Sequence, residues 1–197
     1  INGSEKENLR YMYCDVSNEK DIKYLVDSVI KRYDRIDILV NNAGIIRRRQ
    51  GEEIKIGDWD IVFKVNIRGL FIFCKYVSEI MKKQRSGKIV NISSIAGKVG
   101  DITSAPGYGP SKSALNGLTK TFARELAPYN VNVNAIAPHA IATDMSAEWS
   151  DEKREKVISE IPLNKLGKPS NVAAAVLFLI SEGADFITGE IIDVNGG

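Results

Sequence analysis

The feature that most constrains this fold is a regular alternation of short apolar segments with longer segments of helical spacing. We expect strands over residues 9–14, 36–40, 89–92, 131–137 and 191–194. Helices are expected over 22–33, 58–83, 108–126, 151–161 and 169–180. Strands that alternate with helices form a parallel sheet with helices on both faces. The sequence therefore predicts an α/β fold with a doubly wound parallel sheet.

Composition limits the classes of protein that this chain can belong to. The chain has 197 residues, of which 44% are hydrophobic and 26% charged, and it shows no repeat or linker, so we expect one domain spanning 1–197. Its 27 basic and 25 acidic side chains leave a net charge of +2, which predicts neither a nucleic-acid nor a membrane partner. The longest apolar run, 172–180, falls short of the roughly 20 residues that a bilayer span needs.

Cysteine and histidine usage argues against a metal site. Cys14 and Cys74 form no CxxC pair, and His139 is the single histidine, so no zinc-type ligand cluster is expected. Two cysteines without an obvious pairing in a domain of this size suggest a reducing, cytoplasmic setting.

A tyrosine and a lysine one helical turn apart form the first candidate for chemistry. Tyr108 and Lys112 have i, i+4 spacing near the start of an expected helix, so their side chains share one face. A nearby lysine cation favours the phenolate and lowers the pKa of the phenol from its isolated value of ~10. The pair could thus act as a general acid and base, although a solvated surface pair has the same spacing.

Two further candidates follow expected strands. Ligands of parallel α/β sheets bind beyond the carboxyl ends of the strands, where Ser94 could donate a hydrogen bond to a substrate carbonyl oxygen. We expect the neighbouring Ser93 to make turn hydrogen bonds instead. The other candidate is the loop Asn41-Asn42-Ala43-Gly44, whose small residues would let a ligand approach the backbone, although a generic loop would look the same.

The order and spacing of these motifs resemble the short-chain dehydrogenase/reductase family over about residues 9–197. The resemblance rests on Asp15-Val16, Asn41-Asn42-Ala43-Gly44, Lys64-Val65-Asn66, Asn91-Ile92-Ser93-Ser94, Tyr108-x-x-x-Lys112, 134–138, 143–145 and the ending 187–197. It implies a Rossmann-like fold and an oxidoreductase that interconverts a secondary alcohol and a ketone by direct hydride transfer with NAD or NADP, without a metal.

The resemblance also implies a role for each matching residue. Tyr108 would be the acid/base, Lys112 would lower its pKa and hold the nicotinamide ribose, Ser94 would polarise the carbonyl, and Asn66 would hold a water linked to Lys112. An asparagine within a helix is otherwise a solvated or backbone-bonded residue. The positions implied for cofactor binding are Asp15, Val16, Asn41, Ala43, Gly44, Tyr108, Lys112, Pro138, Ile141 and Thr143.

The sequence departs from the family pattern in two places. His139 stands after Pro138 where the family usually has glycine, and we expect the loop to tolerate the histidine without giving it a catalytic role. The glycine-rich TGxxxGxG turn that carries the pyrophosphate is absent from the sequence, as are the family's first two strands. We therefore expect an N-terminally incomplete sheet whose strand ending at Val40 forms an open edge, poor folding and weak cofactor binding.

The substrate is left open between two classes. The sequence resembles both 3-oxoacyl carrier-protein reductases and gluconate-type sugar-acid dehydrogenases, and residues 146–161 would form the substrate lid. Arg47, Arg48 and Arg49 form either a solvated basic run or a site for an anionic substrate. Family members are commonly tetramers, so a homotetramer or dimer is expected. The alternative function is a truncated, non-catalytic relative that acts through oligomer or protein contacts.

Overall fold

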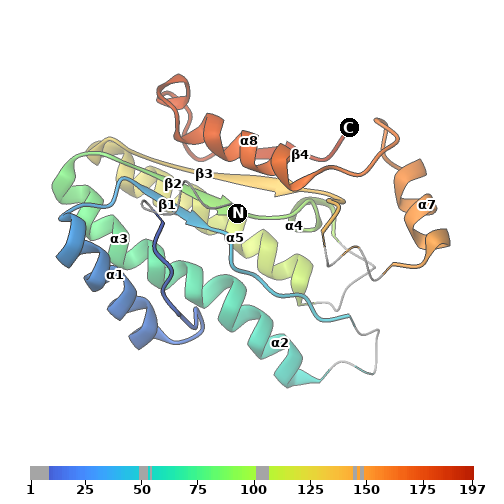
Figure 1. The fold of residues 1–197 in the computed structure, drawn as a ribbon, viewed down its shortest axis with the longest axis horizontal. Coiled ribbons are helices and arrows are strands. Elements are labelled where there is room, and N and C mark those ends of the chain that lie inside the picture. Colours follow the sequence, from blue (N-terminus) through green and yellow to red (C-terminus); the bar gives the residue numbers. More distant parts are fainter. Residues whose placement is uncertain (1–8, 49–52, 54, 101–106, 144–145, 147–148) are drawn as a thin grey trace.

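A four-stranded parallel sheet forms the centre of the computed structural model, which describes residues 9–48, 53, 55–100, 107–143, 146 and 149–197. The strands β1 (Ile38–Asn41), β2 (Gly87–Ile92), β3 (Val131–Pro138) and β4 (Ile191–Val194) lie in the order β1-β2-β3-β4 (Figure 1). All three pairings are parallel. The predicted α/β class with helices on both faces is therefore confirmed, and β1 forms an edge of the sheet as expected.

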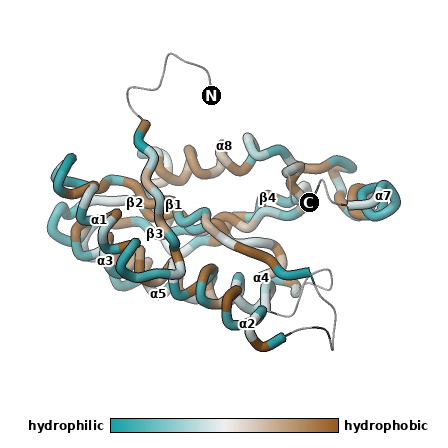
Figure 2. Tube along the Cα trace, turned by 60° about the horizontal axis from the view of Figure 1, so that its bottom comes forward, coloured by the Kyte–Doolittle hydropathy of each residue, from teal (hydrophilic) through white to brown (hydrophobic). Residues whose placement is uncertain are grey.

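One face of the sheet is covered by three helices. They are α1 (Glu19–Tyr33), α3 (Leu70–Gln84) and α5 (Tyr108–Leu126), which lie on the same side of the strands in Figures 1 and 2. Their apolar faces meet alternate strand residues such as Ile89 and Val133 in a core that includes 17 buried residues of the described part of the chain. The side chain of Asn18 caps α1 by accepting the Lys20 N–H at 3.0 Å.

The opposite face carries only α8 (Pro169–Ile180) among the described helices (Figure 2). Among the described residues, its core contains four buried ones, Val90, Ile136, Leu179 and Ala184. The strand residues Ile38 and Val40 remain 44% and 40% exposed, and Phe178 of α8 is 46% exposed. This face is therefore much less completely packed than the face covered by α1, α3 and α5.

The prediction of a strand over residues 9–14 is wrong. No residue of this segment pairs with a strand, and Tyr11 and Tyr13 are 80% and 88% exposed. A strand needs a partner for its backbone groups, and none of the described strands lies on that side of β1. The alternation of residues alone therefore could not produce a strand here.

The helix expected over 58–83 is interrupted in its middle. It begins as α2 (Ile56–Phe63), passes through a π-helical turn over Lys64–Gly69, and continues as α3. Such turns are rare and frequently lie at functional sites. At its end, the Gly69 backbone approaches the Val16 backbone so closely that a Cβ at Gly69 would lie 2.3 Å from the Val16 carbonyl oxygen.

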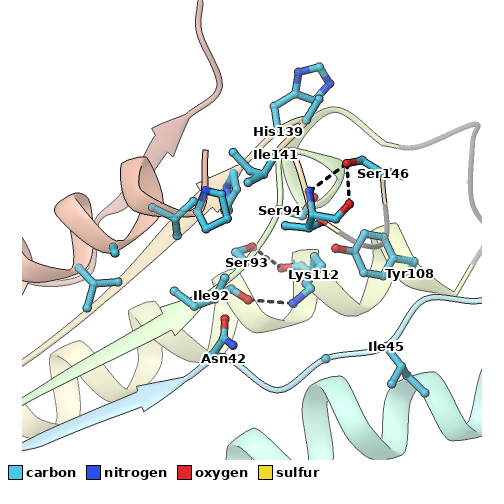
Figure 3. Close-up of a pocket in the computed structure, with 18 of the residues that line it drawn as sticks. Asn42, Ile45, Ile92, Ser93, Ser94, Tyr108, Lys112, His139, Ile141 and Ser146 are labelled. Atoms are coloured by element: carbon cyan, nitrogen blue, oxygen red, sulfur yellow. Dashed lines mark hydrogen bonds between the residues drawn. The ribbon is translucent and has the colours of Figure 1, made fainter. Parts of the chain in front are cut away.

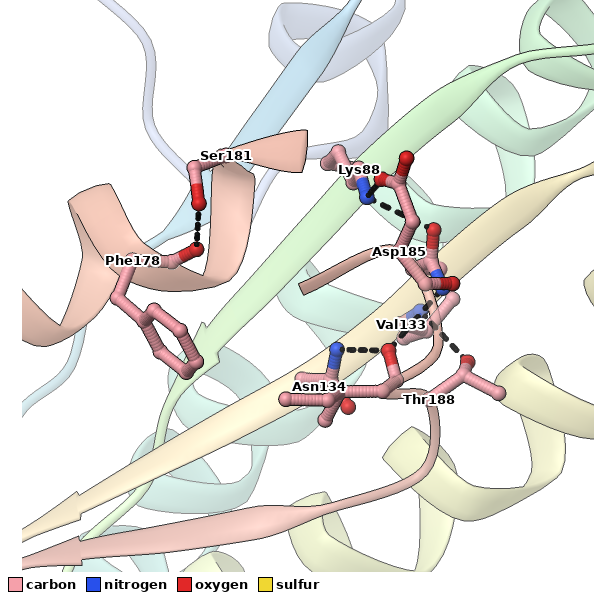
Figure 4. Close-up of polar contacts among 9 residues, drawn as sticks. Lys88, Val133, Asn134, Phe178, Ser181, Asp185 and Thr188 are labelled. Carbon is pink, nitrogen blue, oxygen red and sulfur yellow. Dashed lines mark hydrogen bonds and ion pairs between the residues drawn. The ribbon is translucent and has the colours of Figure 1, made fainter. Parts of the chain in front are cut away.

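The C-terminal part contains α7 (Asp151–Ser159) and a 3-10 turn over Glu182–Ala184 before β4, and another 3-10 turn, Ala127–Tyr129, follows α5. Polar side chains tie the segment before β4 to β3 (Figure 4). Asn134 Nδ2 donates to the Ile187 carbonyl at 2.9 Å, and the Val133 N–H donates to Thr188 Oγ1 at 3.1 Å. Within the described residues, no helix is both long and apolar enough to cross a membrane.

Candidate active site

A cavity of about 700 Å³ lies at the carboxyl ends of β1, β2 and β3. Seven predicted site residues line it: Gly44, Ser94, Tyr108, Lys112, Pro138, Ile141 and Thr143. They come from four separate parts of the chain, which the parallel sheet brings to one edge. In Figure 3 the Tyr108 hydroxyl and the Lys112 ammonium face a common space.

Lys112 is held deep in this site. The residue is only 4% exposed, and its Nζ donates to the Ile92 carbonyl at 2.8 Å. Burial disfavours the charged form and lowers the pKa of Lys112 from 10.5 to about 8. The ammonium therefore remains mostly charged at neutral pH, and its Nζ lies 5.8 Å from the centre of the Tyr108 ring.

Ser94 is fixed by the short helix α4 (Ala96–Val99) that follows it. Its Oγ accepts the Ala96 N–H at 3.2 Å, and its carbonyl accepts the Gly97 N–H at 3.0 Å. The serine hydroxyl retains its own proton for donation, because both of these bonds use Ser94 as the acceptor. Ser94 can therefore donate to an oxygen in the cavity.

Asn66 does not line the cavity but connects two of its walls. It lies on the π-helical turn and is 1% exposed. Its Oδ1 accepts the Ile45 N–H at 2.8 Å, and its Nδ2 donates to the Ile45 carbonyl and to Ser111 Oγ, both at 3.0 Å. The amide thus joins the loop after β1 to helix α5, which carries Tyr108 and Lys112.

Ser93 and His139 are the two residues for which the sequence favours a structural role over a catalytic one. Ser93 is buried and donates to Asn116 Oδ1 at 2.7 Å, which agrees with the structural role expected for it, although it also borders the cavity. His139 is exposed, has no positive φ, and its ring points away from Tyr108 and Lys112 (Figure 3). Its backbone therefore needs no glycine.

Four of the residues expected to bind the cofactor, Asp15, Val16, Asn41 and Ala43, lie outside the cavity lining. Asp15 is exposed, and the Ser17 N–H bond to its Oδ1 lowers the pKa of its carboxyl group. Val16 and Ala43 likewise lie outside the lining, and Ala43 is exposed. Asn41 is buried, and its Nδ2 donates to Asn91 Oδ1 at 2.8 Å, so its side chain is used within the protein.

The three arginines have different surroundings. Arg47 forms an ion pair with Asp58 at 3.7 Å, whereas Arg48 lines the cavity. Arg49 lies outside the described residues, as do Asp144 and Met145 of the motif at 143–145. Of the two arginines that the structure describes, Arg48 is therefore the one that borders the cavity.

Several lining residues escaped the sequence analysis. They are Ile45 and the side of α8 formed by Val172, Ala173, Val176 and Leu177, whereas Asn42 belongs to the candidate loop 41–44 and Ser146 and Trp149 to the expected lid 146–161. The apolar side of α8 looked like ordinary core, and no short pattern distinguishes a wall of a cavity from a packed face.

The lining fits the nicotinamide end of a dinucleotide better than it fits a metal. Gly44 lies directly beside the polar groups, since an added Cβ there would be 3.4 Å from both Lys112 Nζ and Asn66 Oδ1. Lys112, Tyr108 and Thr143 offer polar groups beside an apolar wall. No group of three or more potential metal ligands occurs among residues that the structure describes.

Comparisons with known proteins agree with this geometry. A family described as "Enoyl-(Acyl carrier protein) reductase" matches residues 3–197. A 3-oxoacyl-[acyl-carrier-protein] reductase of Thermotoga maritima is 44% identical over 186 residues, covering 93% of this chain and 74% of that protein. The corresponding enzyme of Aquifex aeolicus is 47% identical over 180 residues, covering 91% and 72%.

A solved structure is similar over nearly the whole chain. It is described as ElxO with NADP bound, has a TM-score of 0.92 and is 36% identical in sequence. The match covers 98% of this chain and 79% of that chain. The four-stranded parallel sheet and its helices therefore correspond to part of a larger fold that is known with a bound dinucleotide.

Proposed function

The chain belongs to the short-chain dehydrogenase/reductase family, and from that premise we propose that it interconverts a 3-oxoacyl group and the 3-hydroxyacyl alcohol with NADPH or NADH. Membership of the family by itself makes the chain part of an oxidoreductase that uses NAD or NADP. The observation that carries the finer proposal is the meeting of Ser94, Tyr108 and Lys112, from separate motifs, around one cavity.

The dinucleotide would be held along the carboxyl edge of the sheet. Lys112 and Tyr108 would bind the nicotinamide ribose, Pro138, Ile141 and Thr143 the nicotinamide side, and Asn41, Ala43, Gly44, Asp15 and Val16 the adenosine side. When bound, it supplies a hydride to the ketone or accepts one from the alcohol. None of these residues belongs to a glycine-rich turn of the kind that holds a pyrophosphate.

The protein's own groups then handle the oxygen and the proton. Ser94 Oγ–H would donate to the ketone oxygen and hold it next to the Tyr108 hydroxyl. Tyr108 would transfer its proton to that oxygen as negative charge develops there. Lys112, charged at neutral pH, would stabilise the resulting phenolate. Asn66 would hold helix α5 and the loop at Ile45 in place, so that a water between them could return a proton to Tyr108 through Lys112.

The substrate proposal follows the relatives rather than the family description. Enoyl reduction adds hydride to a carbon–carbon double bond, whereas a serine hydroxyl beside a tyrosine suits the oxygen of a ketone. A second candidate, a sugar acid, is favoured by Arg48, which lines the cavity and can pair with a carboxylate.

A substrate panel tests the proposal. Oxidation of NADPH and of NADH is followed by absorbance with acetoacetyl thioester, a crotonyl thioester and a keto sugar acid. We expect the acetoacetyl thioester to give the highest kcat/KM. A higher kcat/KM with the crotonyl thioester or with the sugar acid would show that the 3-oxoacyl group is not the preferred substrate. No turnover with any of them, and no thermal shift with either dinucleotide, would favour the non-catalytic alternative.

The expected setting and assembly belong to the same proposal. Cys14 and Cys74 are both free thiols, which suits a reducing compartment such as the cytoplasm. A homotetramer or homodimer is proposed from the family, with no nucleic acid or membrane as partner. Sedimentation of the purified protein would give the assembly state.

A further inference from the structure

A second glycine near the cavity, Gly97, makes a contact that its own helix does not explain. Gly97 lies in α4, and its φ is not positive, so alanine could adopt the same backbone conformation. Glycine within a helix is less favourable than alanine, because it loses more conformational freedom on folding. The reason for glycine at this position must therefore come from packing against another element.

That element is the backbone of α5 at Lys112. A Cβ added to Gly97 would lie 2.7 Å from the Lys112 carbonyl carbon, 2.8 Å from its Cβ and 2.9 Å from its carbonyl oxygen. These distances are shorter than real side-chain carbons show, and the atoms involved are mostly backbone, which cannot rotate away. A methyl group at position 97 would therefore push α4 and α5 apart.

Hydrogen bonds hold the two helices together around this contact. Ser113 Oγ donates to the Gly97 carbonyl at 2.8 Å, and Asn116 Nδ2 reaches the same carbonyl at 3.4 Å. On the other side, Ser93 Oγ bonds Asn116 Oδ1 at 2.7 Å and lies 3.4 Å from the Lys112 carbonyl. Hydrogen bonds thus hold α4 and α5 together on both sides of Gly97. The short distance between the two helices is possible because glycine has no side chain.

We propose that Gly97 is a positioning residue: its contact with α5 sets the separation between the Ser94 hydroxyl, fixed by α4, and the Tyr108–Lys112 pair, carried by α5. Ser94 is bonded to the first turn of α4 at Ala96 and Gly97. Lys112 is the residue that Gly97 touches. A shift of α4 relative to α5 therefore changes the distance between the groups that must reach one oxygen. This inference rests on the proposed function.

Gly97→Ala tests it, with Gly117→Ala as the matched control. Gly117 lies in α5, is exposed, and has no atom within 4 Å of an added Cβ. We expect Gly97→Ala to lower kcat by at least about tenfold with the KM for the dinucleotide within twofold, since an ångström of misplacement is costly for catalysis. Gly117→Ala should keep kcat and unfold at the same or a higher temperature.

Two further readouts keep the outcome decisive. Ser113→Ala removes the hydrogen bond to the Gly97 carbonyl without adding atoms, so it replaces Gly97→Ala if that variant does not fold, with a smaller loss in kcat expected. A second readout does not depend on turnover. Burial lowers the pKa of Lys112 to about 8, so the stability of the folded protein rises with pH between about 8 and 10.5. Gly97→Ala should weaken this rise, because water would reach Lys112. Wild-type kcat in the folded Gly97→Ala protein, or in Ser113→Ala where Gly97→Ala does not fold, overturns the proposal.

Failure of the inference and failure of the proposed function give different results. If the wild type reduces the ketone and Tyr108→Phe does not, an active Gly97→Ala rejects the positioning role alone. If the wild type is inert with every substrate, the proposed reaction fails. The positioning of Lys112 by Gly97 is then judged from the pH dependence of stability, and an unchanged profile in Gly97→Ala rejects it.

Discussion

The two faces of the sheet differ in how completely they are built. The face under α1, α3 and α5 has a core of 17 buried residues and carries Asn66, Tyr108 and Lys112 on its helices. In the described part of the chain, the core under α8 has four buried residues, and Ile38, Val40 and Phe178 are partly exposed. The groups proposed for proton transfer therefore belong to the well-packed face.

This difference suggests that the two halves of the proposed function depend on different parts of the molecule. Catalytic groups need fixed geometry, which dense packing and satisfied hydrogen bonds provide. Asn66 makes three hydrogen bonds, and Lys112 is held on the Ile92 carbonyl. By contrast, Asp15 and Ala43, proposed for the adenosine end, are exposed beside the open edge of the sheet.

The largest effect is expected for Tyr108→Phe. Loss of the phenolic proton should lower kcat by about a thousandfold, whereas dinucleotide affinity should change less than about twofold. Steady-state kinetics and titration of binding by calorimetry measure the two quantities. Tyr33→Phe, an exposed tyrosine in α1, is the control. Substantial activity in Tyr108→Phe would place the acid/base elsewhere.

Two phenylalanines test the contrast between the faces directly. Phe122 is 6% exposed in the core under α5, and Phe178 is 46% exposed on α8. Phe122→Ala should lower the free energy of unfolding by about 3–5 kcal/mol, and Phe178→Ala by less than about 1 kcal/mol. Denaturant unfolding measures both. Equal losses would mean that the face under α8 is covered by further packing.

Lys112→Met should lower kcat and raise the free energy of unfolding at neutral pH. Below pH 8 the lysine is charged in both the folded and unfolded states, and burial of that charge opposes folding. Between pH 8 and 10.5 the folded state releases the proton first, so the stability of the wild type rises with pH, by on the order of 3 kcal/mol in total.

The variant should therefore be more stable than the wild type at pH 7, and the difference should shrink as the pH rises toward 10. Unfolding by urea at a series of pH values measures this, and kcat of Lys112→Met should fall strongly at every pH. A wild type whose stability relative to the variant does not change over this range would mean that Lys112 is not buried as a charge.

A smaller effect on turnover is expected for Asn66→Ala. The variant lacks the amide that connects Ile45 to Ser111, so helix α5 would be positioned less firmly. We expect kcat to fall by roughly 10–100-fold, at the lower end of the effects of direct acid/base groups. Asn132→Ala removes a comparable amide, bonded to the Asp185 and Ile187 carbonyls, away from the cavity. That control should lose stability only. Equal kcat in the two variants would remove Asn66 from the site.

The sequence predicted the elements whose signals are local. Helix α5 over 108–126, helix α8 over 169–180 and strand β4 over 191–194 have the expected bounds, because apolar spacing and turn residues mark their ends. The segment 9–14 had the pattern of a strand but lacked a partner, and only a sheet can reveal that. The π-helical turn was equally hidden, since its residues keep nearly helical spacing.

The site was predictable where motifs follow strands and hidden where contacts are tertiary. Ser94, Tyr108 and Lys112 could be found from their positions in the chain, and all three line the cavity. The burial of the Asn41 side chain against Asn91 and the contact between Gly97 and Lys112 depend on atoms far apart in sequence. No spacing rule along the chain would have found them.

Transfer of a labelled hydride tests the central claim most directly. The protein is incubated with acetoacetyl thioester and a reduced nicotinamide dinucleotide that carries two deuterium atoms at its reactive carbon, and the product is examined by mass spectrometry. We predict a 3-hydroxyacyl product with one deuterium on the carbinol carbon, formed by the wild type and not by Tyr108→Phe. A product without deuterium, or none at all, would contradict direct hydride transfer at this site.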